Sequence, residues 1–168
     1  GAPDGGIAEL DIDNQREFEG RAFVSPFRKT KAAALQGLGI GVAGTTGRRF
    51  GSSTNAGLAP YRTTAQVNFF RYSPQVVAKG SHTRLSPQAN YYYGSFGAWA
   101  EYVLSSQEVS RGATSTTATT ADNAAWQVGA TYVLTGEKAS YRSVTPAKEL
   151  NFKNGTWGAF ELGTRYAQ

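Results

Sequence analysis

Lysine and arginine side chains dominate a long stretch of the sequence. Between Gly20 and Ala100 there are ten of them and no aspartate or glutamate. Such a stretch creates a positive electrostatic field that attracts anions. It therefore favours binding of an anionic solute or partner, although a basic solvated surface would have the same composition. The ten residues are Arg21, Arg28, Lys29, Lys31, Arg48, Arg49, Arg62, Arg71, Lys79 and Arg84.

Other chemistry has little support in the sequence. The only histidine, His82, lies in the polar run KGSHTR and is interpreted as an exposed loop residue. No G-x-S-x-G nucleophile elbow accompanies it, and the absence of cysteine excludes thiolate nucleophiles and thiolate metal sites. The run DIDN (Asp11 to Asn14) begins like a calcium loop, but Arg16 stands where the sharp turn needs glycine. We expect no enzyme, no metal and no cofactor.

A fragmentary G-x-G-x-x-G pattern is formed by Gly39, Gly41 and Gly44. A dinucleotide site would need these glycines to open a helix after a strand. Here they alternate with Leu38, Ile40 and Val42, which predicts a strand with small residues on one face. Such a face allows the close approach of another element.

The elements that would position these residues are long strands. Several reach ten residues or more, against a usual length of about 5–6, and a tilted transmembrane strand needs about 9–11. No apolar run approaches the ~18 residues of a transmembrane helix. We therefore predict an all-β protein, an antiparallel transmembrane β-barrel. The seven expected strands are Gln15 to Ser25, Leu35 to Thr45, Thr64 to Tyr72, Arg84 to Tyr93, Phe96 to Val109, Asn123 to Thr135 and Trp157 to Gln168.

Alternation along the strands assigns side chains to two faces. Charged residues that share one face are expected to face the lumen and to hold the wall together, and alternation from Phe96 adds Trp99 and Glu101 to that inner face. Aromatic residues near strand ends are expected to form an interfacial girdle. The lumen-facing charges are Glu17, Glu19, Arg21, Glu161 and Arg165, and the girdle residues are Tyr91, Tyr93, Phe96, Trp126 and Trp157.

The segment TRLSPQANYYYGSFGAWAEYVLSSQEV (83–109) resembles the phosphate-selective porin O and P family. So do REFEGRAFVSPF, LQGLGIGVAGTTG, YRTTAQVNFFRYS, AAWQVGATYVLTGE, ASYRSVTPAK and WGAFELGTRYAQ, in order along the chain. The resemblance implies a sixteen-stranded porin in the outer membrane of a Gram-negative bacterium, usually a homotrimer surrounded by lipid and lipopolysaccharide. It also implies passive diffusion of anions such as phosphate or polyphosphate. Residues 1–168 would form a single partial β-barrel domain, an internal portion with about seven strands.

The tight turn at Gly94-Ser95 is typical of the periplasmic side of a barrel. Strict alternation then places 46–63 and 136–156 on that side, and 26–34, 73–83 and 110–122 outside. His82 and Arg111 join the basic residues expected at the outer mouth. The candidate anion-pathway residues are Lys79 and Arg84, then Arg62 and Arg71, with Arg28, Lys29 and Lys31 at the mouth.

A different class of protein fits part of the sequence. Aromatic and basic residues interleave in YRTTAQVNFFRYS, as they do in stacking platforms that bind single-stranded nucleic acid. The alternative is therefore a soluble β-sheet module that binds polyanions, either nucleic acid or an acidic glycan. The porin interpretation, in contrast, predicts no nucleic-acid partner. Extraction separates them, because a barrel requires detergent whereas the module dissolves in buffer.

Overall fold

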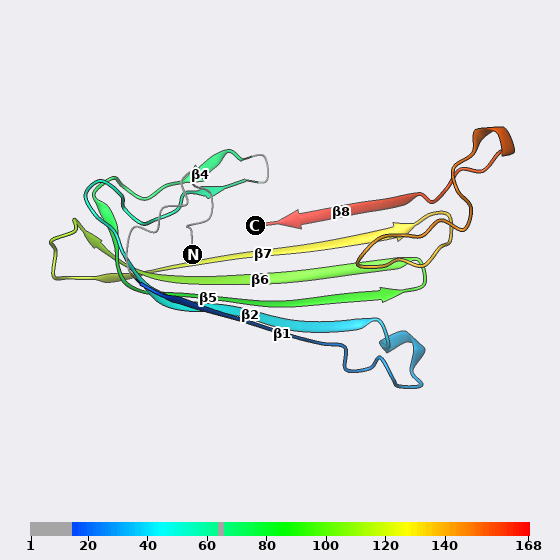
Figure 1. Cartoon of the computed structure of the whole chain (residues 1–168), viewed down its shortest axis with the longest axis horizontal. Helices are drawn as coiled ribbons and strands as arrows, with labels where there is room; N and C mark the ends of the chain where they lie inside the picture. Colours follow the sequence, from blue (N-terminus) through cyan, green and yellow to red (C-terminus); the bar gives the residue numbers. More distant parts are fainter. Residues whose placement is uncertain (1–14, 64–65) are drawn as a thin grey trace. The chain divides into compact units, whose positions relative to one another are not determined.

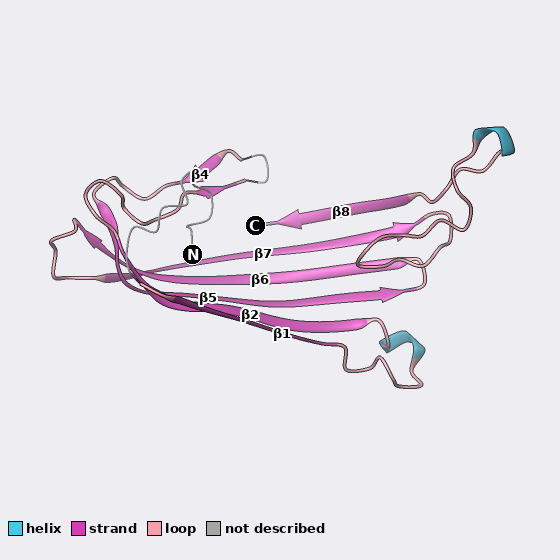
Figure 2. Ribbon diagram, viewed as in Figure 1, coloured by secondary structure: helices cyan, strands magenta, loops and turns pink. Residues whose placement is uncertain are grey.

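The structure is a computed structural model that describes residues 15–63 and 66–168. The DIDN run lies outside these residues. Apart from two short 3-10 helices, η1 (Ala33–Leu35) and η2 (Phe152–Asn154), the regular structure of the described part is β-strand (Figure 2). No helix in that part is long and apolar enough to cross a membrane. The strands are β1 (Glu17–Val24), β2 (Leu38–Phe50), β3 (Tyr61–Arg62), β4 (Asn68–Phe70), β5 (Val76–Tyr93), β6 (Phe96–Arg111), β7 (Thr119–Val133) and β8 (Glu161–Ala167).

Six strands form one sheet in the order β1-β2-β5-β6-β7-β8, and the neighbouring strands can be followed in Figure 1. The β7–β8 pair is antiparallel, with a register that runs from Gln127 opposite Ala167 to Val133 opposite Glu161. At the start of β2, the carbonyl of Gly37 accepts a hydrogen bond from the N–H of Tyr92, at the end of β5. The predicted all-β antiparallel fold is therefore confirmed.

Six of the expected strands are present: β2, β5, β6 and β7 are longer than predicted, β5 by the most, whereas β1 and β8 are shorter. β5 has 18 residues and begins at Val76, whereas the sequence predicted a connector as far as Thr83. The reason is packing at the start of the strand. Val77 and Ala78 are almost fully buried, and the N–H of Ala78 donates to the carbonyl of Ala56 in the preceding connector.

The segment Thr64 to Tyr72 was expected to form a strand of the main sheet, and this prediction is wrong. Within the described part of that range, Asn68–Phe70 is strand β4, and it pairs only with β3 in a separate two-stranded sheet. Aromatic packing accounts for this local hairpin, since the ring centroids of Tyr61 and Phe70 lie 5.7 Å apart. Consequently β5, and not this segment, is the sheet neighbour of β2.

Because β5 is the neighbour of β2, the connector after β1 lies at the opposite end of the strands from the one predicted. Residues 26–34 were expected on the side opposite the Gly94-Ser95 turn. Instead, the hydroxyl of Tyr91 donates to the carbonyl of Ala34 at 2.8 Å, and Tyr92 bonds to Gly37. The connector therefore lies beside the end of β5 that leads into the Gly94-Ser95 turn.

The chain divides into two compact units, which are described separately. Unit 1 consists of the described residues of 1–20, together with 44–85 and 104–123. Unit 2 consists of 21–43, 86–103 and 124–168.

Candidate functional site

Alternation in unit 2 produces one polar and one apolar sheet face. On the polar face the carboxylate of Glu101 accepts a hydrogen bond from Ser86 at 2.7 Å and another from Gln127 at 2.6 Å. These contacts join β5, β6 and β7. On the other face, apolar side chains line an open hollow in which Tyr102 and Trp126 are the largest residues. The remaining apolar residues of that hollow are Pro87, Ala89, Ala100 and Val128.

Trp99 lies on the polar face, as alternation from Phe96 predicted. The guanidinium carbon of Arg165 is 5.8 Å from the centroid of its ring. The ring also covers Gly129 on β7, because a Cβ built there would be 2.5 Å from Trp99 Cζ2. Trp99 therefore belongs to the polar wall together with Glu101.

Another aromatic ring, that of Phe23, packs against the glycines of β2. A Cβ on Gly39 would lie 2.6 Å from Cζ of Phe23, and one on Gly41 would lie 2.5 Å from Cδ2 of the same ring. Phe23 thus packs directly against the β2 backbone. This confirms the predicted close approach of another element, and these glycines lie within a strand and not at the opening of a helix.

A groove of about 850 Å³ lies on the polar face of unit 2. One wall comes from β1 and β5, and the other from the connector that follows β7. That connector is pinned by the N–H of Ala139, which donates to the carbonyl of Gly94 at 2.9 Å. In Figure 1 it loops back beside the ends of β6 and β7. It brings Ser140, Tyr141 and Arg142 to the groove.

The groove is cationic. Arg21, Arg28 and Arg142 line it, and none of the described residues that line it is Asp or Glu. Arg21 donates to Oε1 of Gln88 at 2.9 Å, which orients its guanidinium group. Among the described ion pairs and hydrogen bonds, neither the Arg28 nor the Arg142 guanidinium meets a carboxylate. Their charges therefore remain available to an anion.

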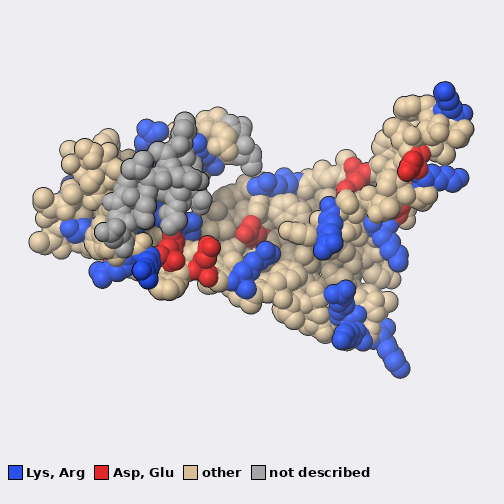
Figure 3. Space-filling model, viewed as in Figure 1, with Lys and Arg blue, Asp and Glu red and all other residues tan. Residues whose placement is uncertain are grey.

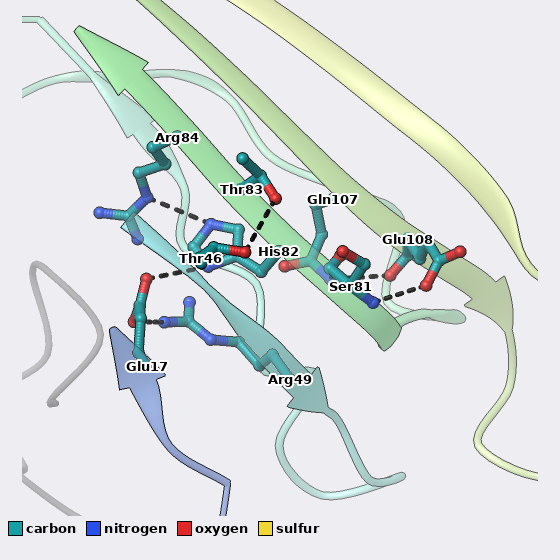
Figure 4. A network of polar contacts seen from close by, with 9 residues as sticks. All are labelled: Glu17, Thr46, Arg49, Ser81, His82, Thr83, Arg84, Gln107 and Glu108. Atoms are coloured by element: carbon teal, nitrogen blue, oxygen red, sulfur yellow. Dashed lines mark hydrogen bonds and ion pairs between the residues drawn. The ribbon is translucent and has the colours of Figure 1, made fainter. Parts of the chain in front are cut away.

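Unit 1 contains a different arrangement, a network of paired polar side chains (Figure 4). Glu17 on β1 lies 3.6 Å from Arg49 on β2 and 3.4 Å from Nδ1 of His82 on β5. Nε of Arg84 donates to Nε2 of His82 at 3.1 Å. The predicted exposed loop position of His82 is wrong: this side chain is 5% exposed, because β5 already includes residues 76–83.

The network continues from β5 to β6. The N–H of Ser81 donates to Oε2 of Glu108, and Nε2 of Gln107 donates to the carbonyl of Ser81 at 3.3 Å. On the β2 side, the hydroxyls of Thr46 and Thr83 are 3.4 Å apart. Polar contacts therefore join β1, β2, β5 and β6 in unit 1.

The connector that contains β3 and β4 packs on the same residues of unit 1. Tyr61 interacts with Tyr72, Ser105 and Arg84, and burial together with the Tyr72 hydroxyl raises the pKa of Tyr61. Nδ2 of Asn123 donates to the hydroxyl of Tyr72 at 3.1 Å. In both units, then, a connector lies against polar side chains of the sheet.

The predicted anion-pathway residues are divided between the two units. Arg28, Lys29 and Lys31 belong to unit 2, whereas Lys79, Arg84 and Arg111 belong to unit 1. Two candidates have protein partners, because Lys79 donates to the carbonyl of Ala113 and Arg62 to Asn68, both at 2.9 Å. Arg71, Lys29 and Lys31 are exposed, and basic side chains predominate on the face drawn in Figure 3.

Two residues of the groove, Arg21 and Arg142, were not predicted from the sequence to line the anion pathway. Arg21 was predicted as a structural charge, and it lines the groove as well as bonding to Gln88. Arg142 was not singled out, because it lies in a polar connector with no periodic pattern to place it. Among the other predicted lumen charges, Glu19, Glu161 and Arg165 are exposed, and Arg165 lies opposite Gly129 in the β7–β8 register.

The predicted girdle residues differ in their positions along the strands. Tyr91 and Phe96 flank the turn with ring centroids 6.4 Å apart, and Tyr93 is exposed beside them. Trp126 lies in the middle of β7, because the strand begins at Thr119 and not at Asn123. Trp157 precedes β8 and packs edge-on against Phe152 in the connector.

Long antiparallel strands with one polar and one apolar face, and connectors packed on the polar face, define the class of β-barrel porins. The chain belongs to the phosphate-selective porin O and P family, whose match covers residues 12–168. Porins are channels, so this is not an enzyme family. No curated protein and no solved structure matches the chain significantly.

Proposed function

We propose that this chain forms part of the wall of a passive diffusion channel in the outer membrane of a Gram-negative bacterium, selective for anions such as phosphate or polyphosphate. One observation carries the proposal. The unit 2 groove gathers Arg21, Arg28 and Arg142, without an Asp or Glu among its described lining residues. Guanidinium groups bind phosphate oxygens through paired N–H donors, with more geometric specificity than an ammonium group.

Permeation requires binding that attracts the solute and still releases it. Several spaced cations satisfy this requirement better than one deep site. The groove arginines supply the main binding step, and the other basic residues raise the local anion concentration. These further positions are Lys79, Arg84, Arg62, Arg71, Lys29 and Lys31.

The proposal extends to the surroundings of the channel. The apolar face that carries Trp126, Tyr132, Leu134 and Leu162 contacts lipid, and Tyr91, Tyr93, Phe96 and Trp157 contact the membrane interface. Lipopolysaccharide surrounds the outer end of the channel. Both units belong to one β-barrel domain over residues 1–168, and the complete channel is a homotrimer. The channel catalyses no reaction, requires no cofactor and takes no nucleic acid as a partner.

Ion selectivity tests the proposal directly. The protein is reconstituted in a planar bilayer under a potassium chloride gradient, and the reversal potential is measured. We expect the sign that indicates chloride preference, together with inhibition of the chloride current by phosphate. A reversal potential that indicates preference for potassium would overturn the proposed function.

A soluble polyanion-binding module is the second candidate. Phe69 in β4 is 68% exposed and neighbours Arg71, which is the kind of surface such a module would use. Membrane extraction and gel migration separate the candidates. The channel should require detergent and migrate differently when heated, whereas a module released by buffer alone would favour the second candidate.

A further inference from the structure

A second groove adjoins the cationic groove of unit 2. It has a volume of about 450 Å³ and shares several lining residues with the first, including Gln88, Tyr92 and Tyr141. It extends along β6 and β8 to Trp99, Glu101 and Glu161. One continuous depression therefore has an end with three arginines, of which Arg142 lines both grooves, and an end with two carboxylates, where the Arg165 guanidinium lies on the Trp99 ring. We refer to it as the bipartite groove.

We propose that the bipartite groove binds a phosphate monoester whose remaining part is uncharged and rich in hydroxyls, that is, a sugar phosphate. The inference rests on the proposed anion channel and names its preferred substrate class. The phosphate group lies among Arg21, Arg28 and Arg142, and the sugar lies toward Trp99 and the carboxylates.

A sugar phosphate and an inorganic polyphosphate differ in the charge of the part that lies beyond the first phosphate group. Both can place one phosphate group among the arginines. The rest of a polyphosphate is also anionic and would extend toward Glu101 and Glu161, where two carboxylates repel it and the single cation at that end, Arg165, offsets only part of the repulsion. A sugar carries no charge beyond its phosphate, so its approach to the carboxylates has no such cost.

The carboxylate end also offers suitable hydrogen-bond partners. Carboxylate oxygens accept bonds from hydroxyl donors, and such charge-assisted bonds are stronger than neutral ones. Each Glu101 oxygen accepts one protein donor, from Ser86 or Gln127, and retains capacity for another. Glu161 is exposed at the start of β8. The side-chain amides of Gln88 and Asn90 add both donors and acceptors between the two ends.

Aromatic rings provide the remaining contact. Phe23, Tyr92 and Tyr141 line both grooves, and Tyr141 is 73% exposed. A ring of this kind has an apolar body and, in tyrosine, a polar tip, which suits the mixed surface of a sugar.

Inhibition of chloride current in planar bilayers tests the inference. The solutes are glucose 6-phosphate, inorganic phosphate, pyrophosphate and, as a control without phosphate, glucose. We expect glucose 6-phosphate to block at about tenfold lower concentration than inorganic phosphate, which corresponds to about 1.4 kcal/mol. Block by inorganic phosphate or pyrophosphate that is as strong as block by glucose 6-phosphate would overturn the inference. An anion-selective channel with that result would leave the proposed function intact.

Variants locate the effect in the groove. Tyr141→Ala and Glu161→Gln should each lower the ratio of the glucose 6-phosphate and inorganic phosphate affinities by about threefold or more, and Glu161→Gln should also strengthen block by pyrophosphate. Tyr132→Ala is the matched control, since Tyr132 lies on the opposite face and is 52% exposed. Calorimetric titration in detergent gives the same ratio for any variant that does not insert in bilayers. An unchanged ratio in both groove variants would contradict the assignment.

Discussion

Basic side chains on the polar strands can be compared between unit 1 and unit 2. In unit 1, Arg49 faces Glu17, Arg84 donates to His82, and Lys79 donates to the carbonyl of Ala113. In unit 2, Arg28 and Arg142 line an open groove whose described lining residues include no Asp or Glu. The same residue types therefore hold strands together in one unit and remain open to solutes in the other.

The difference shows that nearby acceptors decide the role of a cation. A guanidinium group beside a carboxylate or imidazole already has a hydrogen-bond partner, and an anion must compete with that partner. A guanidinium group that faces a groove without a carboxylate can form charge-assisted hydrogen bonds with an incoming phosphate. Net charge alone, +5 for this sequence, does not separate these cases.

The largest expected effect tests this comparison by charge removal. In the double variant Arg28→Gln/Arg142→Gln, which removes two guanidinium partners of the phosphate, half-inhibition of the chloride current should need at least about 100 times more phosphate. The reason is that each charge-assisted hydrogen bond contributes about 1.5–3 kcal/mol, and 1.4 kcal/mol corresponds to a factor of ten. Concentration–block curves in planar bilayers measure this change.

The matched change in unit 1 is Lys79→Gln/Arg84→Gln, which removes the same number of charges. We expect less than about a threefold change in phosphate block, because both side chains are engaged by protein acceptors. If the two unit 1 substitutions weakened phosphate block more than the two unit 2 substitutions, the roles assigned to the two units would be reversed.

Much of the fold could be predicted from strand patterning. Alternation placed Trp99 and Glu101 on the polar face, and strand length distinguished transmembrane-type strands from ordinary ones. The connector between β2 and β5 could not be predicted in the same way. Its NFF run has the composition of a strand, yet local packing between Tyr61 and Phe70 keeps it in a hairpin. One missing sheet strand then changed the side predicted for residues 26–34.

The candidate site was less predictable than the fold, because it depends on contacts between distant segments. The acid-free stretch includes Arg21 and Arg28, which line the groove. Arg142 lies more than a hundred residues later and reaches the groove through a connector in which the N–H of Ala139 bonds to the carbonyl of Gly94. The partners of Lys79 and Arg84 are likewise invisible in sequence spacing. The sequence therefore indicated the chemistry but not which cations are open to it.

An intermediate effect is expected from the glycines that shape the wall of the groove. Gly41→Val places side-chain atoms against Phe23, so the free energy of unfolding should fall by about 1–3 kcal/mol, as is usual for overpacking. Phosphate block should also weaken, because Phe23 lines the groove. The control is Gly20→Val in β1, where a Cβ would meet nothing within 4 Å. Urea unfolding in detergent measures both variants, and equal losses would show that close packing at Gly41 is not required.

The smallest expected effect concerns the connector that carries Arg142. The carboxylate of Glu137 accepts hydrogen bonds from the Thr135 hydroxyl and from the N–H of Ala147, and the two bonds close the connector into a loop. These same bonds, with Thr135 as the larger cause, hold the pKa of Glu137 below its ordinary value of 4.5. Because this pKa is lowered in the folded state, the stabilisation is present above the ordinary value and is lost as pH falls through the folded one.

Hydrogen exchange at the Ala147 amide measures this loss directly. Protection of that amide, relative to the Glu137→Gln variant at each pH, should be highest above about pH 4.5 and should approach the variant's value at lower pH. The substitution retains the size of the side chain but cannot titrate, so it corrects for the intrinsic pH dependence of exchange. Protection that stayed equal in the two proteins at every pH would show that the carboxylate does not hold the loop. Arg142 would then be presented to the groove by the bond between Ala139 and Gly94 alone.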